Sequence, residues 1–233
     1  MLESIIEIFT NPWTWAHYWD GLVKTVQLVF ISLLVGGMLA VPLAIMRTSR
    51  NRFINWPVWA FTYLFRGTPL IIQLYLIYYG VTLIEGIQES IWLELFKRAF
   101  YPCLIAFALN TAAYTTEIFR GAIEATPRGE IEAAKAYGMS WAKRMRRIIL
   151  PSAFRRAIPA YSNEIIFMLH ASAIASTVTI IDLLGAARDV YARYYAPFEA
   201  FISIGLIYLC LTFGILAIFK QLEKRLLGHL QPR

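Results

Sequence analysis

The chain has 233 residues, of which 58% are hydrophobic and only 16% are charged. A soluble domain of this size usually carries about 25% charged residues, so this composition excludes one ordinary water-soluble core. The net charge of +7 could indicate nucleic acid or anionic lipid as a partner. The cations cluster where apolar segments end, however, which is typical of membrane orientation and argues against nucleic-acid binding. We therefore expect an all-α integral membrane protein with a single domain over residues 1–233.

Residues 1–21 lack Lys and Arg, so they do not have the basic start of a signal peptide. Their Trp and Tyr side chains predict an interfacial lead-in to the first membrane helix. Within that helix, Gly36 and Gly37 would permit a close helix approach or a bend, and Pro42 would permit a kink near its end.

Five apolar segments are long enough to cross about 30 Å of hydrocarbon. They are expected at residues 25–46, 53–84, 99–119, 157–181 and 200–219. The second segment is long for one straight helix and is interrupted by Arg66-Gly67-Thr68-Pro69, which predicts a broken or strongly kinked span. An amphipathic connector (residues 85–98) and a mixed one (residues 182–197) join the remaining spans.

The Lys and Arg residues at the span ends predict the orientation, because cytoplasmic loops are rich in them. The first loop, residues 120–156 and the tail carry 3, 9 and 4 of these cations, whereas the opposite side carries five. This bias predicts an N-terminus outside and a C-terminus inside, in a multi-pass membrane protein.

A charged stretch, EAAKAYGMSWAKRMRRIILP (residues 132–151), interrupts the apolar sequence. Its Glu, Ala and Lys residues favour a helix, with acids early and cations late, as the helix dipole prefers. Gly138 interrupts this helix, and a second helix is expected to end before Pro151. From these properties alone, the stretch could also be a basic juxtamembrane helix that binds anionic headgroups.

The spacing of this stretch is E-A-A, three residues, G, nine residues, I, one residue, L-P, and it resembles the EAA loop of ATP-binding-cassette importer permeases. The matching positions are Glu132, Ala133, Ala134, Gly138, Ile148, Leu150 and Pro151. FRGTPLIIQL (65–74) and NTAAYTTEIFRGAI (110–123) are similar to the polar-amino-acid subfamily of these permeases. NEIIFMLHASAIAS (163–176) resembles the M-type membrane subunits of the histidine, lysine, arginine and ornithine importers.

This resemblance implies a multi-pass permease of the bacterial inner membrane that imports amino acids, basic ones foremost, by alternating access. Its coupling loop, at about residues 121–156, would dock into a groove of a separate ATPase. The implied partners are a second permease chain, two ATPase subunits and a periplasmic binding protein, with lipid around the permease. A heterotetramer is favoured, and a homodimer of permeases stays open. The chain lacks a GxxxxGK[ST] loop, so ATP and Mg²⁺ belong to the ATPase, and this chain needs no cofactor and is not an enzyme.

Polar residues inside the spans are candidates for substrate binding. An unpaired carboxylate is costly in a membrane, so Glu164 needs a partner, a proton or a water-filled cavity. It either meets the cationic side chain of a basic substrate or forms a pair within the membrane, for instance with Arg66 or Arg120. Met168 and Ser172 follow Glu164 on the same helix face and could extend a pocket wall. Asn110 and Gln73 could bind the substrate's α-amino or carboxylate group, or could equally bond a neighbouring helix.

Other side chains have simpler interpretations. Glu117 and Arg120 are expected to form a local ion pair, and His170 to be a packing residue, because no second His or Cys lies at metal spacing. Cys103 and Cys210 are expected to be small packing residues.

Two alternatives to the permease remain for the whole chain. A proton-coupled secondary transporter or channel, with Glu164 and His170 as a relay, would leave the EAA spacing unexplained. A membrane-embedded enzyme is the other alternative, but the sequence contains no Ser-His-Asp set, metal cluster or paired catalytic carboxylates that would support it.

Overall fold

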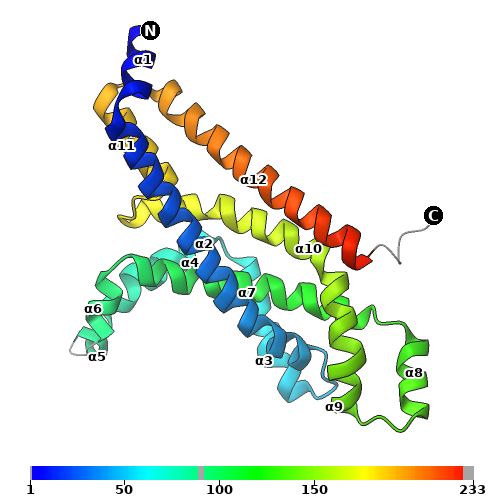
Figure 1. Ribbon diagram of the computed structural model, residues 1–233. Helices are drawn as coiled ribbons and strands as arrows, with labels where there is room; N and C mark the ends of the chain where they lie inside the picture. Colours follow the sequence, from blue (N-terminus) through cyan, green and yellow to red (C-terminus); the bar gives the residue numbers. More distant parts are fainter. Residues whose placement is uncertain (1, 89–91, 228–233) are drawn as a thin grey trace.

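The computed structural model describes residues 2–88 and 92–227, and these residues form helices without a strand. These residues contain twelve α-helices, which are labelled α1 to α12 in chain order (Figure 1). Their bounds are α1 Leu2–Thr10, α2 Pro12–Arg47, α3 Arg52–Gly67, α4 Leu70–Tyr75, α5 Glu85–Gln88, α6 Trp92–Lys97, α7 Phe100–Glu124, α8 Arg128–Ala136, α9 Trp141–Arg144, α10 Leu150–Ala171, α11 Leu183–Tyr194 and α12 Pro197–Leu227. Two π-helical turns, Leu76–Gly80 and Met145–Ile149, and two 3-10 segments, Val81–Leu83 and Ser172–Val178, continue α4, α9 and α10.

Helix α7 is the centre of the bundle, with α2, α3, α4 and α10 packed around it. The contact with α2 is close at Gly36, where an added Cβ would lie 2.8 Å from the carbonyl oxygen of Ala108 and against the Thr111 side chain. The close approach predicted for this glycine pair is thus confirmed at Gly36. The core around the crossing is apolar and includes Leu28, Leu74, Cys103, Phe107 and Met168.

The first long helix starts earlier than the hydropathy indicated. The Asn11 side chain caps it by accepting a hydrogen bond from the Trp13 backbone N–H at 2.9 Å, and Pro12 occupies its first turn. Residues 12–21, predicted as part of an interfacial lead-in, therefore belong to the same helix as the span predicted from residue 25. Pro42 lies inside this helix, which runs on to Arg47.

The break predicted in the second apolar segment is confirmed. The helix axes on its two sides, α3 and residues 70–83, differ by 105°. Thr68 is extended, as the residue before a proline prefers, and Pro69 supplies no N–H to continue the helix. Gln73 Nε2 donates to the carbonyl oxygens of Phe65 and Thr68 at 2.8 and 3.0 Å, which satisfies backbone groups that the break leaves open.

Among the described residues, two helices, α2 and α12, are each long and apolar enough to cross a membrane. Two bent pairs raise this number to four when each pair is taken as one span. Helix α7, predicted as the third span, has 25 residues but is rich in buried Thr, Ala and Asn side chains, because other helices surround it. The count of five spans stays a prediction.

Two boundaries differ from the sequence-based prediction. The second helix of the charged stretch does not end before Pro151, because α9, a π turn and α10 follow one another and Pro151 lies in the first turn of α10, where a missing N–H is tolerated. Helix α10, which corresponds to the fourth predicted span, consequently starts at Leu150 and not at residue 157. The mixed connector contains helix α11, which Asp182 caps by accepting from the Gly185 N–H at 2.8 Å.

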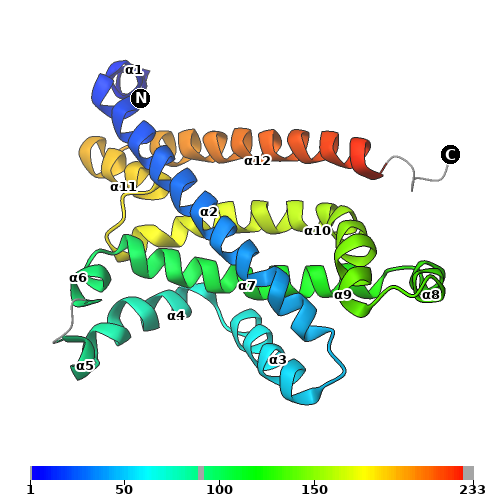
Figure 2. The same ribbon diagram turned by 60° about the horizontal axis from the view of Figure 1, so that its bottom comes forward.

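The helix ends divide into two groups (Figure 2). The turn between α2 and α3, helix α8 and the last described turn of α12 lie at one end of the molecule. Helices α1, α5, α6 and α11 lie at the opposite end. The cation-rich segments of the sequence therefore share one end.

Candidate functional site: the α8–α9 arm and the α7–α10 contact

Residues 125–149, here called the α8–α9 arm, project from one end of the bundle (Figures 1 and 2). Helix α8 turns Glu132 and Ala133 to the surface, whereas Ala134 is buried within the chain, with 4% of its surface exposed. The exposed side of α8 therefore combines a carboxylate with a small side chain, and only one residue of the alanine pair is accessible.

Gly138 ends α8 in a conformation that explains why glycine stands there. Its φ is +70°, a left-handed geometry that disfavours any residue with a Cβ. The Met139 N–H donates to the Ala134 carbonyl at 3.1 Å, and the Gly138 N–H donates to the Lys135 carbonyl at 2.8 Å. These two bonds form a Schellman cap, which ends α8 and reverses the direction of the chain. Ser140 then caps α9 by accepting from the Lys143 N–H.

Arg156 fastens the base of the arm. Its Nε and Nη2 atoms donate to the Ala122 carbonyl oxygen at 3.2 and 3.1 Å, and Nη2 also donates to Thr126 Oγ1 at 2.7 Å. Its Nη1 atom donates to Ser152 Oγ at 2.6 Å. One guanidinium thus joins the end of α7, where the arm begins, to α10, where the arm ends. Sequence reasoning missed this residue, because its partners at the end of α7 and just after it lie 34 and 30 positions away.

Glu117 holds a second network at the same end. Its carboxylate accepts from Arg120 Nε at 2.6 Å, which confirms the predicted local pair. It also accepts from Arg47 Nε of α2 and from Thr62 Oγ1 of α3, both at 3.1 Å. Arg120 donates further to Glu124 at 2.6 Å. The carboxylate therefore ties α2, α3 and α7 together, a role that its local spacing alone did not indicate.

The remaining residues of the predicted coupling pattern lie where the arm returns to the bundle. Ile148 and Leu150 are half-buried and Pro151 is exposed. Leu150 packs beside a cluster that contains Ala44, Phe119 and Ile149. Residues 148–151 of the pattern therefore anchor the arm on α2 and α7, whereas Glu132 and Ala133 are exposed on its surface.

Glu164 lies at the contact of α10 with α7, where 6% of its surface is exposed. Its Oε1 atom accepts a hydrogen bond from Thr111 Oγ1 at 2.8 Å. The alternative of an ion pair with Arg66 or Arg120 is wrong for this structure. Arg120 is bound by Glu117 and Glu124, and the Arg66 guanidinium lies over the Tyr114 ring, 5.3 Å from its centroid.

The other substrate candidates are also enclosed. Met168 and Ser172 follow Glu164 inward and are fully buried, and Ser172 Oγ donates to the Leu169 carbonyl at 2.7 Å. Asn110 Nδ2 donates to Gln73 Oε1 at 3.1 Å, so these two amides join α7 to α4. Contact between any of these side chains and a substrate requires the helices around α7 to separate.

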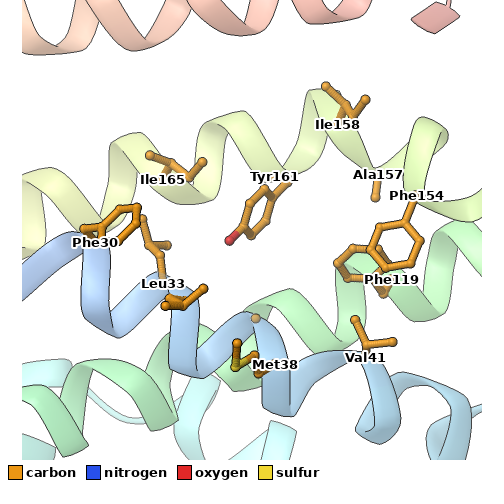
Figure 3. Close-up of a pocket in the computed structure, with 12 residues that line it drawn as sticks. Phe30, Leu33, Met38, Val41, Phe119, Phe154, Ala157, Ile158, Tyr161 and Ile165 are labelled. Carbon is orange, nitrogen blue, oxygen red and sulfur yellow. The ribbon is translucent and has the colours of Figure 1, made fainter.

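A cavity of about 550 Å³ opens beside this contact, between α2, α7 and α10 (Figure 3). The Tyr161 hydroxyl points into it, and the other lining side chains, such as Leu33, Val41 and Phe119, are apolar. None of the five substrate candidates lines this cavity. Because it offers no charge to an amino acid's ammonium or carboxylate group, the cavity does not suit such a substrate.

His170 and the two cysteines, for which the sequence predicts packing roles, differ in their surroundings. His170 Nε2 lies 3.1 Å from Thr212 Oγ1, and Cys103 and Cys210 are free thiols, the first buried and the second exposed.

At the end of the molecule opposite the arm, His17 of α2 lies 3.1 Å from Asp189 of α11. In the connector, the hydrogen bond and the charge of Lys97 lower the pKa of the Glu94 carboxyl. The described ranges contain no group of three or more His, Cys, Asp or Glu that could hold a metal ion.

Comparison with known proteins identifies the class. Residues 32–228 match the family model described as binding-protein-dependent transport system inner membrane component. The chain belongs to this family, so it is a transport subunit of the membrane, as the EAA spacing predicted, and not itself an enzyme.

Particular relatives lie within amino-acid transport systems. Over 235 residues, which cover 100% of this chain and 98% of the relative, the chain is 48% identical to the histidine/lysine/arginine/ornithine transport system permease protein HisM of Escherichia coli (strain K12). It is 41% identical to the nopaline transport system permease protein NocM of Agrobacterium fabrum, over 90% of this chain and 87% of that protein.

Solved structures agree with this placement. A crystal structure of an amino acid ABC transporter with histidines contains a chain with 34% identity and a TM-score of 0.80, over 91% of this chain and 94% of that one. An inward-facing MetNI methionine ABC transporter has the same fold, with a TM-score of 0.69 at 20% identity, over 93% of this chain and 98% of that one.

Proposed function

We infer that this chain is the permease subunit of an ATP-driven importer of basic amino acids: histidine, lysine, arginine and ornithine. The observation that carries this proposal is the 48% identity, over the whole chain, to a permease whose name states these substrates. The chain would move its substrate across the bacterial inner membrane by alternating access. The proton-coupled secondary transporter or channel has no comparable support.

We propose one permease domain over residues 1–233 with five spans. They are α2, the bent pair of α3 and α4, α7, α10 with its 3-10 extension, and α12. The N-terminus would lie outside and the C-terminus inside. The grouping of the α2–α3 turn, α8 and the end of α12 at one end supports this orientation, because the first loop, residues 120–156 and the tail, to which these segments belong, carry 16 of the 22 Lys and Arg residues.

The α8–α9 arm would couple the permease to ATP hydrolysis. The exposed Glu132 and Ala133 would enter a groove of the ATPase, Gly138 would set the angle of α8, and Arg156 would carry its displacement to α7 and α10. The full transporter would contain a second permease chain, two ATPase subunits that bind ATP and Mg²⁺, and a periplasmic binding protein. A different second chain is favoured over a second copy, since the similarity is to an M-type subunit.

Glu164 would bind the cationic side chain of the substrate. It is an acidic residue buried at a helix contact, and a single Thr hydroxyl is its hydrogen-bond partner among the described residues. A basic side chain entering between α10 and α7 would replace this weak partner by a charge-assisted one. Asn110 and Gln73 would bind the α-amino and carboxylate groups, and Met168 and Ser172 would form the pocket wall.

The test is uptake of labelled arginine by the assembled complex in vesicles, with ATP inside or with a proton gradient alone. We expect uptake with ATP only. Glu164→Gln should lower arginine uptake by tenfold or more, because a charge-assisted bond contributes about 1.5–3 kcal/mol. ATP hydrolysis stimulated by the binding protein should fall less, which separates substrate binding from coupling. Unchanged arginine uptake in Glu164→Gln would remove the substrate role, and uptake driven by protons alone would overturn the whole proposal.

A further inference from the structure

A second cavity, of about 680 Å³, lies under the α8–α9 arm. The end of α2 and the α2–α3 turn form one wall, with Thr48 and Arg50 among the lining residues. The arm forms the other wall through Lys135, Arg144 and Trp141. Its volume is in the range of small-molecule sites. In both views the α2–α3 turn lies beside α9, at the end that carries α8 (Figures 1 and 2).

The charge of this cavity has one sign. Three cationic side chains line it, Arg50, Lys135 and Arg144, and none of its lining residues is acidic. Neither Arg50 nor Lys135 takes part in an ion pair within the part of the chain that the structure describes, and Arg144 donates to the backbone carbonyl of Met139. Three neighbouring cations without counter-charges attract an anion.

The rest of the lining is apolar. Ile45, Met145 and Ile149 contribute hydrocarbon surface, and the indole of Trp141, which is 58% exposed, lies beside them. A free inorganic anion would leave this surface unused. The combination of cations, one indole and aliphatic side chains fits an amphiphile that has a phosphate at one end and an apolar body at the other.

The position of the cavity selects the source of that amphiphile. It lies where α2 leaves the apolar bundle, at the end that would face the cytoplasm. We propose that this cavity binds one anionic phospholipid of the cytoplasmic leaflet, with its phosphate between Arg50, Lys135 and Arg144 and its glycerol and first acyl carbons against Ile45, Met145 and Ile149. The bound lipid bridges the α2–α3 turn and the arm, and so holds the arm against the bundle.

This proposal rests on the proposed orientation of the permease, and its test is chosen to be independent of transport. The assembled complex is stripped of lipid in a neutral detergent, and binding of phosphatidylglycerol and phosphatidylcholine with identical acyl chains is followed by native mass spectrometry. We expect one phosphatidylglycerol per copy of this chain to bind tightly. The double variant Arg50→Gln with Lys135→Gln should bind it about 30-fold more weakly, since each cation near an anionic headgroup contributes about a fivefold factor.

The matched control is Lys220→Gln with Lys224→Gln. It removes the same charge from exposed positions of α12 at the same end, away from the cavity. We expect it to leave the affinity for phosphatidylglycerol unchanged. Equal weakening in both double variants would overturn the proposal in favour of general surface attraction. Full competition by inorganic phosphate would overturn it in favour of a free anion.

An ATPase that occupies the cavity is the remaining alternative. If the complex bound no lipid, and if the double variant Arg50→Gln with Lys135→Gln lost the ATPase subunits, the lipid proposal would be overturned in favour of the ATPase as the occupant of the cavity. Arginine uptake is measured on the same samples. Intact ATP-driven uptake without lipid binding would leave the proposed function standing, and lipid binding without ATP-driven uptake would contradict the proposed function alone.

Discussion

The crossing of α2 with α7 and the α8–α9 arm are held by different forces. At the crossing, the helices touch at Gly36, and the surrounding side chains are almost completely buried. Helix α8 stands outside the bundle and depends on a glycine cap and on one guanidinium at the base of the arm, whereas Met145 and Ile149 pack the end of the arm into the bundle. For the proposed coupling role, α8 needs a rigid base and a defined shape, and it does not need a core of its own. The comparison teaches that close packing fixes the bundle, whereas a few directional bonds fix α8.

The largest expected effect comes from filling the crossing. Gly36→Ala would place a Cβ 2.8 Å from the Ala108 carbonyl, and backbone cannot move aside as a flexible side chain does. We expect a loss of about 1–3 kcal/mol in the free energy of unfolding, as for other overpacked sites. The measurement is the thermal unfolding of the detergent-solubilised complex.

Gly37→Ala is the matched control for this change. Its added Cβ would lie 3.6 Å from the Tyr161 hydroxyl, which is ordinary contact, so stability should not fall. Equal destabilisation by the two variants would show that helix glycines matter here for a reason other than the close crossing.

A smaller effect on stability, but a specific effect on coupling, is expected at the base of the arm. Arg156→Gln removes the hydrogen bonds to Ala122 and Thr126, and because this guanidinium is partly exposed we expect a loss of less than about 1.5 kcal/mol in the free energy of unfolding. We expect arginine uptake per ATP hydrolysed to fall, and the backbone amides of residues 128–140 to exchange hydrogen faster.

Arg155→Gln is the control at the neighbouring position. It makes the same change of charge at an exposed residue, and it should leave both readings at the wild-type level. If uptake per ATP were equally low in Arg155→Gln, the loss would reflect charge near the membrane and not the clamp.

The smallest of the three effects concerns the shape of the arm. Gly138→Ala forces a Cβ into the left-handed region at φ +70°, at an expected cost of about 1 kcal/mol. Gly129→Ala lies inside α8 with open space around its Cβ, so it should stabilise the helix by about 0.5–1 kcal/mol. Each of the two readings, arginine uptake and hydrogen exchange in the arm, should therefore change in opposite directions in Gly138→Ala and in Gly129→Ala. A shift in the same direction for both would contradict the role of the left-handed cap.

Several features of the fold followed from local sequence. The break after Gly67 was predictable because Pro69 has no N–H and restricts the residue before it. The turn at Gly138 was predictable because glycine tolerates a positive φ, and the helices around it because Ala, Glu and Lys favour them. Hydropathy alone does not indicate that α2 starts at Pro12, because the uncharged apolar segment begins only near residue 25. The Asn11-Pro12 pair is the local signal for this helix start.

The sequence by itself determined the class of this protein. An apolar composition with cations at segment ends requires helices in a membrane, and the EAA spacing indicates a permease. Only the tertiary structure decided which partners the polar side chains have on other helices. Glu164 meets Thr111 and not an arginine, and Arg156 reaches back to α7. The physical reason is that helix formation depends on neighbours within a few residues, whereas a buried hydrogen bond depends on which helices the packing of small residues such as Gly36 allows to touch.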